Sequence, residues 1–95
     1  MSTQDRNEMI GRILRQQTED RKAIAFIDAE LSDAANSLKK AATQIECLIS
    51  HEPADVGSAL SRINMERILN RLAHREQLQR KLETAKEHLK RLGSK

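Results

Sequence analysis

The sequence predicts an all-α fold: a helical hairpin of two long antiparallel helices, coiled-coil-like in its packing, that dimerises into a four-helix bundle. Strong helix formers dominate the 95 residues, whereas Phe26 is the sole aromatic residue and Pro53 the sole proline. The apolar residues recur at spacings of three and four, as in helices that pack along one face. A single cluster of helix-breaking residues near the middle of the chain separates two such stretches.

The first helix is predicted over residues 3–49. Ser2, followed by Asp5, has the pattern of an N-cap with an acidic residue in the first turn. From Ile10 onward the spacing alternates between three and four. The twelve seam positions are Ile10, Ile13, Gln17, Asp20, Ile24, Ile27, Leu31, Ala34, Leu38, Ala41, Ile45 and Leu48. All except Gln17 and Asp20 are apolar. This is a strong coiled-coil pattern.

The turn is predicted over residues 50–57, in the segment SHEPADVGS, and the second helix over residues 58–92. Pro53 suits a turn or a first helical turn, and Asp55 or Ser58 is the expected N-cap. The apolar members of the second helix are Leu60, Ile63, Ile68, Leu72, Leu78, Leu82, Ala85, Leu89 and Leu92. Arg75 interrupts this stripe, and the spacing shifts between Ile63 and Ile68 as in a stutter.

The whole chain, residues 1–95, is predicted to form one hairpin domain. With the turn near residue 53, the numbers of facing residues should sum to about 105. Ile45 would then face Leu60, Ile27 would face Leu78, and Ile13 would face Leu92.

The apolar stripe of the first helix is wider than a two-helix hairpin needs, which predicts a further helix against it, from a second copy. Leu14, Ala35, Ala42 and Ile49 lie beside the seam, and Ala23 and Phe26 extend the apolar surface further around the helix. The alternative is that Phe26 and the alanines are isolated exposed residues of a monomer.

Charge is unevenly distributed along the chain. Residues 28–66 hold three bases and seven acids, whereas residues 67–95 hold nine bases and three acids. Two hairpins packed antiparallel would bring these opposite charges together.

Three polar residues are expected to form a layer between the helices. Gln17 and Asp20 occupy seam positions, and the predicted register places His88 near them. Such layers fix the register and the partner number of coiled coils. A proton-sensitive switch or a metal site is the alternative interpretation of this layer.

Arg67, Arg71 and Arg75 recur every four residues along one ridge of the second helix, so they could follow a phosphate backbone. Interleaved glutamates and the lack of aromatic residues for base stacking count against this reading. An acidic protein partner or a solvated helix face explains the arginines equally well.

No catalytic, cofactor-binding or metal-binding motif stands out. There is no glycine-rich phosphate loop and no HExxH motif, and Cys47 is the only cysteine. The lone thiol and the absence of a signal-like or membrane-spanning segment predict a cytoplasmic protein that does not enter a membrane. The expected function is therefore that of a non-enzymatic protein–protein interaction module, acting as a homodimer on an unidentified protein partner. A nucleic-acid-binding bundle is the alternative.

Overall fold

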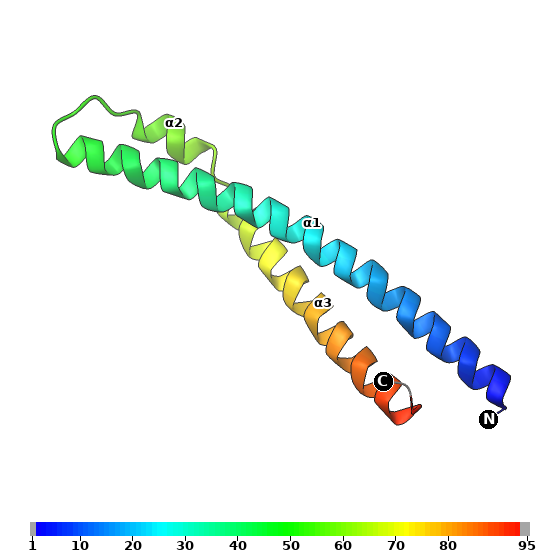
Figure 1. Cartoon of the computed structure of the whole chain (residues 1–95). Coiled ribbons are helices and arrows are strands. Elements are labelled where there is room, and N and C mark those ends of the chain that lie inside the picture. Colours follow the sequence, from blue (N-terminus) through cyan, green and yellow to red (C-terminus); the bar gives the residue numbers. More distant parts are fainter. Residues whose placement is uncertain (1, 94–95) are drawn as a thin grey trace. The chain divides into compact units, whose positions relative to one another are not determined.

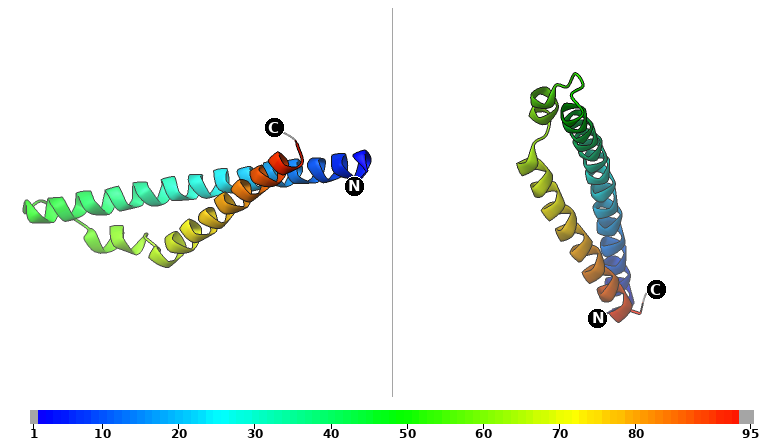
Figure 2. Two further views of the ribbon diagram at one scale, coloured as in Figure 1. Left: turned by 90° about the horizontal axis from the view of Figure 1, so that it is seen from below. Right: turned by 90° about the vertical axis from the view of Figure 1, so that its left-hand side faces the viewer.

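The computed structural model describes residues 2–93, and this part of the chain contains three helices, α1 (Thr3–Ile49), α2 (Val56–Ser61) and α3 (Met65–Arg91) (Figure 1). The chain reverses direction after α1, and α2 and α3 return along it, which confirms the all-α helical hairpin (Figure 2). It packs as two compact units. Unit 1 combines the chain up to Phe26 with the chain from Ala73 onward, and unit 2 contains Ile27–Leu72.

Both ends of α1 are closed by local hydrogen bonds. At the start, the Asp5 N–H donates to the Ser2 hydroxyl oxygen at 3.1 Å, so Ser2 is the N-cap that the sequence predicts. At the end, the N–H groups of His51 and Glu52 donate to the carbonyls of Leu48 and Cys47, a Schellman motif. His51 occupies the left-handed position of this motif with φ of 59°, which usually favours glycine.

The second helix of the predicted hairpin is two helices in the structure, with a break at residues 62–64. Asp55 caps α2 by accepting a hydrogen bond from the Ser58 N–H at 3.1 Å. Asn64 then caps α3 by accepting from the Arg67 N–H at 3.0 Å. The break falls where the apolar spacing shifts, because Asn64 satisfies the first free amides of a new helix.

The register differs from the predicted one by about one to two helical turns. The cross-helix pairs Arg6–Leu92, Asp20–Lys81, Glu30–Arg67, Glu30–Arg71 and Gln44–Asp55 have residue numbers that sum to between 97 and 101, not 105. The reason lies in residues 52–55, which are not helical. Non-helical chain advances about 3.3 Å per residue against about 1.5 Å in a helix, so the loop passes several residues of α1 before α2 begins.

The buried residues divide between the two units. Unit 1 buries Ile24, Leu78 and Leu89 together with two polar residues, Gln17 and Asp20. Unit 2 buries only Ile27, at 2% exposure, and Ala41 among its described residues. Most of the apolar side chains of unit 2 must therefore lie at least partly in solvent.

Candidate protein-docking surface

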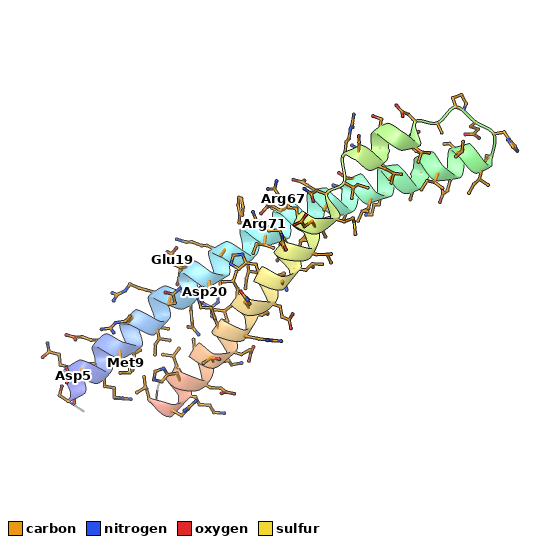
Figure 3. The ribbon with its side chains drawn as sticks, turned by 180° about the vertical axis from the view of Figure 1, so that it is seen from behind. Asp5, Met9, Glu19, Asp20, Arg67 and Arg71 are labelled. Atoms are coloured by element: carbon orange, nitrogen blue, oxygen red, sulfur yellow. The ribbon has the colours of Figure 1, made fainter. Side chains whose placement is uncertain are left out.

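The polar layer of unit 1 is built around Asp20, which is only 5% exposed. Its Oδ1 atom accepts a hydrogen bond from Gln16 Nε2 at 3.0 Å and lies 4.0 Å from Lys81 Nζ (Figure 3). Gln17 is equally buried beside it. His88 is exposed, so Lys81 is the residue of α3 that approaches the carboxylate. A buried carboxylate whose charged partner is mostly in solvent is costly to desolvate.

Two of the three predicted arginines meet one carboxylate in unit 2. Arg67 Nη2 donates to Glu30 Oε2 at 2.8 Å, and Arg71 Nε lies 3.0 Å from Glu30 Oε1 (Figure 3). The second contact is an ion pair without hydrogen-bond alignment, because Oε1 is buried and has no hydrogen-bond partner. Arg75 is half-buried in unit 1 and makes an interaction of its own. A phosphate approaching Arg67 or Arg71 would have to compete with Glu30.

A groove of about 300 Å³ lies in unit 2 beside this cluster. Its lining mixes carboxylates, guanidinium groups and aliphatic side chains: Glu30, Leu31, Asp33, Ala34, Ser37, Arg62, Ile63, Asn64, Arg67, Ile68 and Arg71. The groove holds no histidine or cysteine; its potential acid–base or nucleophilic groups are the carboxylates of Glu30 and Asp33 and the hydroxyl of Ser37. The Glu30 carboxylate is already paired with two arginines.

The face that α1 turns toward α2 consists of small and polar residues. Ala34, Ser37, Ala41 and Gln44 are buried or half-buried, and Gln44 Oε1 accepts a hydrogen bond from the Asp55 N–H at 2.8 Å. Small side chains let α2 come close, and the Gln44 amide satisfies a loop N–H. The apolar positions of this part of α1 are consequently turned away from α2.

Five residues on the exposed side of α1 form what we term the α1 stripe: Ala35, Leu38, Ala42, Ile45 and Ile49. All five are exposed, and Ile49 reaches 72%. Leu38 and Ile45 were predicted to lie in the seam between the helices. That prediction is wrong for these two residues, at 42% and 40% exposure, and for Leu48, at 58%. The predicted seam residues Ala34 and Ala41 do lie inward, on the Gln44 side of α1 that faces α2.

A second exposed apolar set, Met65, Leu69 and Leu72, lies at the start of α3. Leu69 and Leu72 directly follow Ile68 and Arg71, so this set lies one residue, or about 100°, further around α3 than those two residues. The members of the α1 stripe likewise follow the inward-facing residues of α1 by one residue, so the stripe is rotated by the same angle in the same sense. In antiparallel helices equal rotations of the same sense point to one side, so the two sets share one face of unit 2. Met65 and Leu69 were missed in the sequence, although their spacing with Leu72 is helical.

The other residues predicted to associate lie in unit 1. Phe26 is 65% exposed, Leu14 is also exposed, and Ala23 is half-buried. Phe26 and Leu14 are separated by about 120° around α1, at about 100° per residue, so they do not share one face. Unit 1 therefore offers two isolated apolar positions and unit 2 a contiguous face.

The described residues contain no cluster of three or more potential metal ligands, and Cys47 is a half-buried free thiol. Within residues 2–93, neither long helix includes a stretch apolar enough to cross a bilayer. No known protein family matches this chain, and neither a curated protein nor a solved structure is significantly similar to it.

Proposed function

We propose that this protein is a non-enzymatic interaction module that self-associates and presents a helical surface to a protein partner in the cytoplasm. The observation that carries the proposal is the exposure of large apolar side chains in unit 2. Eight of them are exposed there: Leu38, Ile45, Leu48, Ile49, Leu60, Met65, Leu69 and Leu72. Six of them, all except Leu48 and Leu60, lie on the face formed by the α1 stripe and the start of α3. Apolar residues that share one face, unlike scattered ones, mark interaction surfaces.

The free energy gained by covering all eight side chains is comparable to the cost of association. The exposed fractions of the eight residues together amount to about four whole side chains. Covering them would contribute about 6–12 kcal/mol per copy, at roughly 1.5–3 kcal/mol for each fully buried aliphatic side chain. The freedom lost on association costs roughly 4–15 kcal/mol, so two copies that cover each other's face can form a stable complex.

The total exposed area supports the same proposal. The chain exposes 7406 Å² as a monomer. A folded monomer of this mass is expected to expose roughly 5500 Å². The excess, roughly 1900 Å² per chain, is more than the roughly 800 Å² that each partner buries in a standard interface.

Nucleic-acid binding through Arg67, Arg71 and Arg75 is the less favoured function. Glu30 already engages two of these arginines, and that carboxylate would repel a phosphate. Unit 1, however, carries twelve bases and seven acids, so weak and salt-sensitive binding to polyanions is expected of it without any dedicated site.

Light scattering across a range of protein concentrations, at low and at moderate salt, tests the proposal. We expect the mass to rise toward that of a dimer and to stay there at moderate salt, because apolar contacts are not screened. Phe26→Glu tests whether unit 1 takes part in the interface. A dimer that persists in this variant associates through another surface, whereas a dimer that dissociates depends on Phe26. A chain that remains monomeric throughout, yet binds a DNA or RNA oligonucleotide in a manner abolished by Arg67→Gln with Arg71→Gln, would overturn the proposal.

A further inference from the structure

The α1 stripe has the spacing of a coiled-coil seam that is separate from the one inside the hairpin. Its members, Ala35, Leu38, Ala42, Ile45 and Ile49, follow one another at intervals of three, four, three and four. This is the a and d pattern of a helix that packs against one more helix. All five side chains are exposed, from 40% at Ile45 and 42% at Leu38 to 72% at Ile49, so the described chain covers this seam only in part.

The two charges beside the stripe lie on the same flank and have opposite signs. Lys39 and Glu46 are seven residues apart, and each directly follows a stripe residue, Leu38 or Ile45. Both are exposed. The residues on the opposite flank, Ala34, Ala41 and Leu48, are uncharged. One edge of the stripe is therefore charged, with a lysine nearer the N-terminus of α1 and a glutamate nearer its C-terminus.

We propose that the stripe packs against the stripe of a second copy, with the two α1 helices antiparallel and Lys39 of each copy paired with the partner's Glu46. The proposal rests on the self-association described above and specifies its surface. In this register Leu38 lies opposite the partner's Ile49, and Ala42 lies opposite the partner's Ile45.

The antiparallel direction follows from the charges. In antiparallel helix pairs each edge of a seam meets the same edge of the partner, so the charged flanks come together. Because the two copies run in opposite directions, Lys39 of each copy lies beside Glu46 of the other. This gives two equivalent pairs related by the twofold axis. In a parallel pair each edge meets the opposite edge, and Lys39 and Glu46 would lie beside uncharged Ala34, Ala41 and Leu48.

A second copy is also the occupant that the geometry favours over an unrelated helix. The register set by the charges places a twofold axis between Ala42 and Ile45, so Ala42 packs against the partner's Ile45 and Leu38 against the partner's Ile49. The same axis covers the identical stripe on both copies, so its exposed apolar side chains leave solvent on both copies at once.

Charge reversal distinguishes this arrangement from others. Lys39→Glu, Glu46→Lys, the double exchange and the control Lys40→Glu are compared with wild type by sedimentation equilibrium at low ionic strength. Lys40 lies beside α2, on the other side of α1, where it lines a second groove. Each single change at Lys39 or Glu46 is expected to weaken dimerisation roughly three- to thirtyfold, since two attractive pairs become repulsive. The double exchange should restore wild-type affinity, and Lys40→Glu should leave it unchanged.

Mixing provides the sharper test. An equimolar mixture of Lys39→Glu with Glu46→Lys is expected to associate more tightly than either variant alone, because both pairs in the mixed dimer have opposite charges. Ala42→Glu, at the centre of the stripe, should abolish dimerisation without loss of helical circular dichroism.

The possible results distinguish failure of this dimer arrangement from failure of the proposed self-association. A wild-type dimer whose affinity responds equally to Lys39→Glu and Lys40→Glu, or that the double exchange fails to restore, overturns this arrangement and leaves self-association standing. A wild-type chain that is monomeric at every concentration overturns both.

Discussion

Units 1 and 2 share α1 and α3, and unit 2 also contains α2, but the two units differ in how far they bury their apolar residues. Unit 1 buries Ile24, Leu78 and Leu89 around the polar pair Gln17 and Asp20, and leaves only Leu14 and Phe26 exposed among its large apolar side chains in the described chain. Unit 2 buries Ile27 and Ala41 and leaves eight large apolar residues exposed. Unit 1 thus completes its interface within the chain, and unit 2 does not.

The difference teaches that a helical hairpin can bury most of its apolar core in one part and leave large apolar side chains exposed in another. Unit 1 also carries a net charge of +5, from twelve bases and seven acids, and unit 2 a net charge of −2, from five bases and seven acids. A small core of this kind leaves unit 2 with little stability of its own. Contact with a second copy would supply what is missing.

The largest effect is expected from truncating a buried leucine of unit 1. Leu78→Ala should lower the free energy of unfolding by about 2–4 kcal/mol at any protein concentration, because it leaves a cavity. Leu38→Ala in unit 2 should cost less than about 1 kcal/mol in dilute protein and more in concentrated protein, where association buries the side chain. Urea unfolding followed by circular dichroism at two concentrations measures both. Equal losses of unfolding free energy for Leu78→Ala and Leu38→Ala in dilute protein would contradict the difference in burial between units 1 and 2.

A stabilising change is expected in the polar layer of unit 1. Asp20→Leu should raise the free energy of unfolding by about 1–3 kcal/mol, because a buried carboxylate with one distant, partly solvated lysine costs more to desolvate than it gains. The exposed neighbour Glu19, changed in the same way to Leu, should alter stability little. Loss of stability in Asp20→Leu would show that the bonds from Gln16 and Lys81 outweigh desolvation.

The helix break in unit 2 is expected to depend on its cap. Asn64→Ala removes the acceptor of the Arg67 N–H and should cost about 1 kcal/mol. Asn70→Ala, an exposed position inside α3, should instead stabilise by a few tenths of a kcal/mol, since alanine is the better helix former. If chemical denaturation gives both variants the same stability, Asn64 does not hold the start of α3.

The smallest effect concerns the turn that closes unit 2. His51→Gly should stabilise the protein by about 0.5–1 kcal/mol, because glycine adopts the positive φ of this position without the steric cost of a Cβ atom. His74→Gly, inside α3, should have the opposite sign and cost a few tenths of a kcal/mol. Thermal melting of the two variants gives the comparison directly. A loss of stability in His51→Gly would contradict the strain assigned to this residue.

Much of the secondary structure was predictable because its causes are local. The bounds of α1 match the predicted residues 3–49, and the hydroxyl of Ser2 and the carboxylate of Asp55 cap helices as expected. The break before α3 was visible only as an irregular spacing between Ile63 and Ile68. Asn64 was the signal that would have identified it, since asparagine is among the strongest N-caps.

The candidate surface was predictable only in part. Ala35, Ala42 and Ile49 were assigned to self-association, and they lie exposed on the α1 stripe. Leu38 and Ile45 were assigned to the interior seam, and Met65 and Leu69 were not singled out. An apolar period identifies the residues of one helix that seek a partner, but it does not say which partner they meet.

The sequence by itself determined that this chain is helical, that it turns back once, and that α1 carries more apolar surface than one partner helix can cover. Only the tertiary structure decided which part of that surface the hairpin uses. Two seams overlap on the second half of α1, one through Leu38 and Ile45 and one through Ser37 and Gln44. The choice between them depends on where the loop returns the chain to α1 and on the Gln44 bond to the Asp55 N–H, contacts between residues distant in sequence that no local pattern encodes.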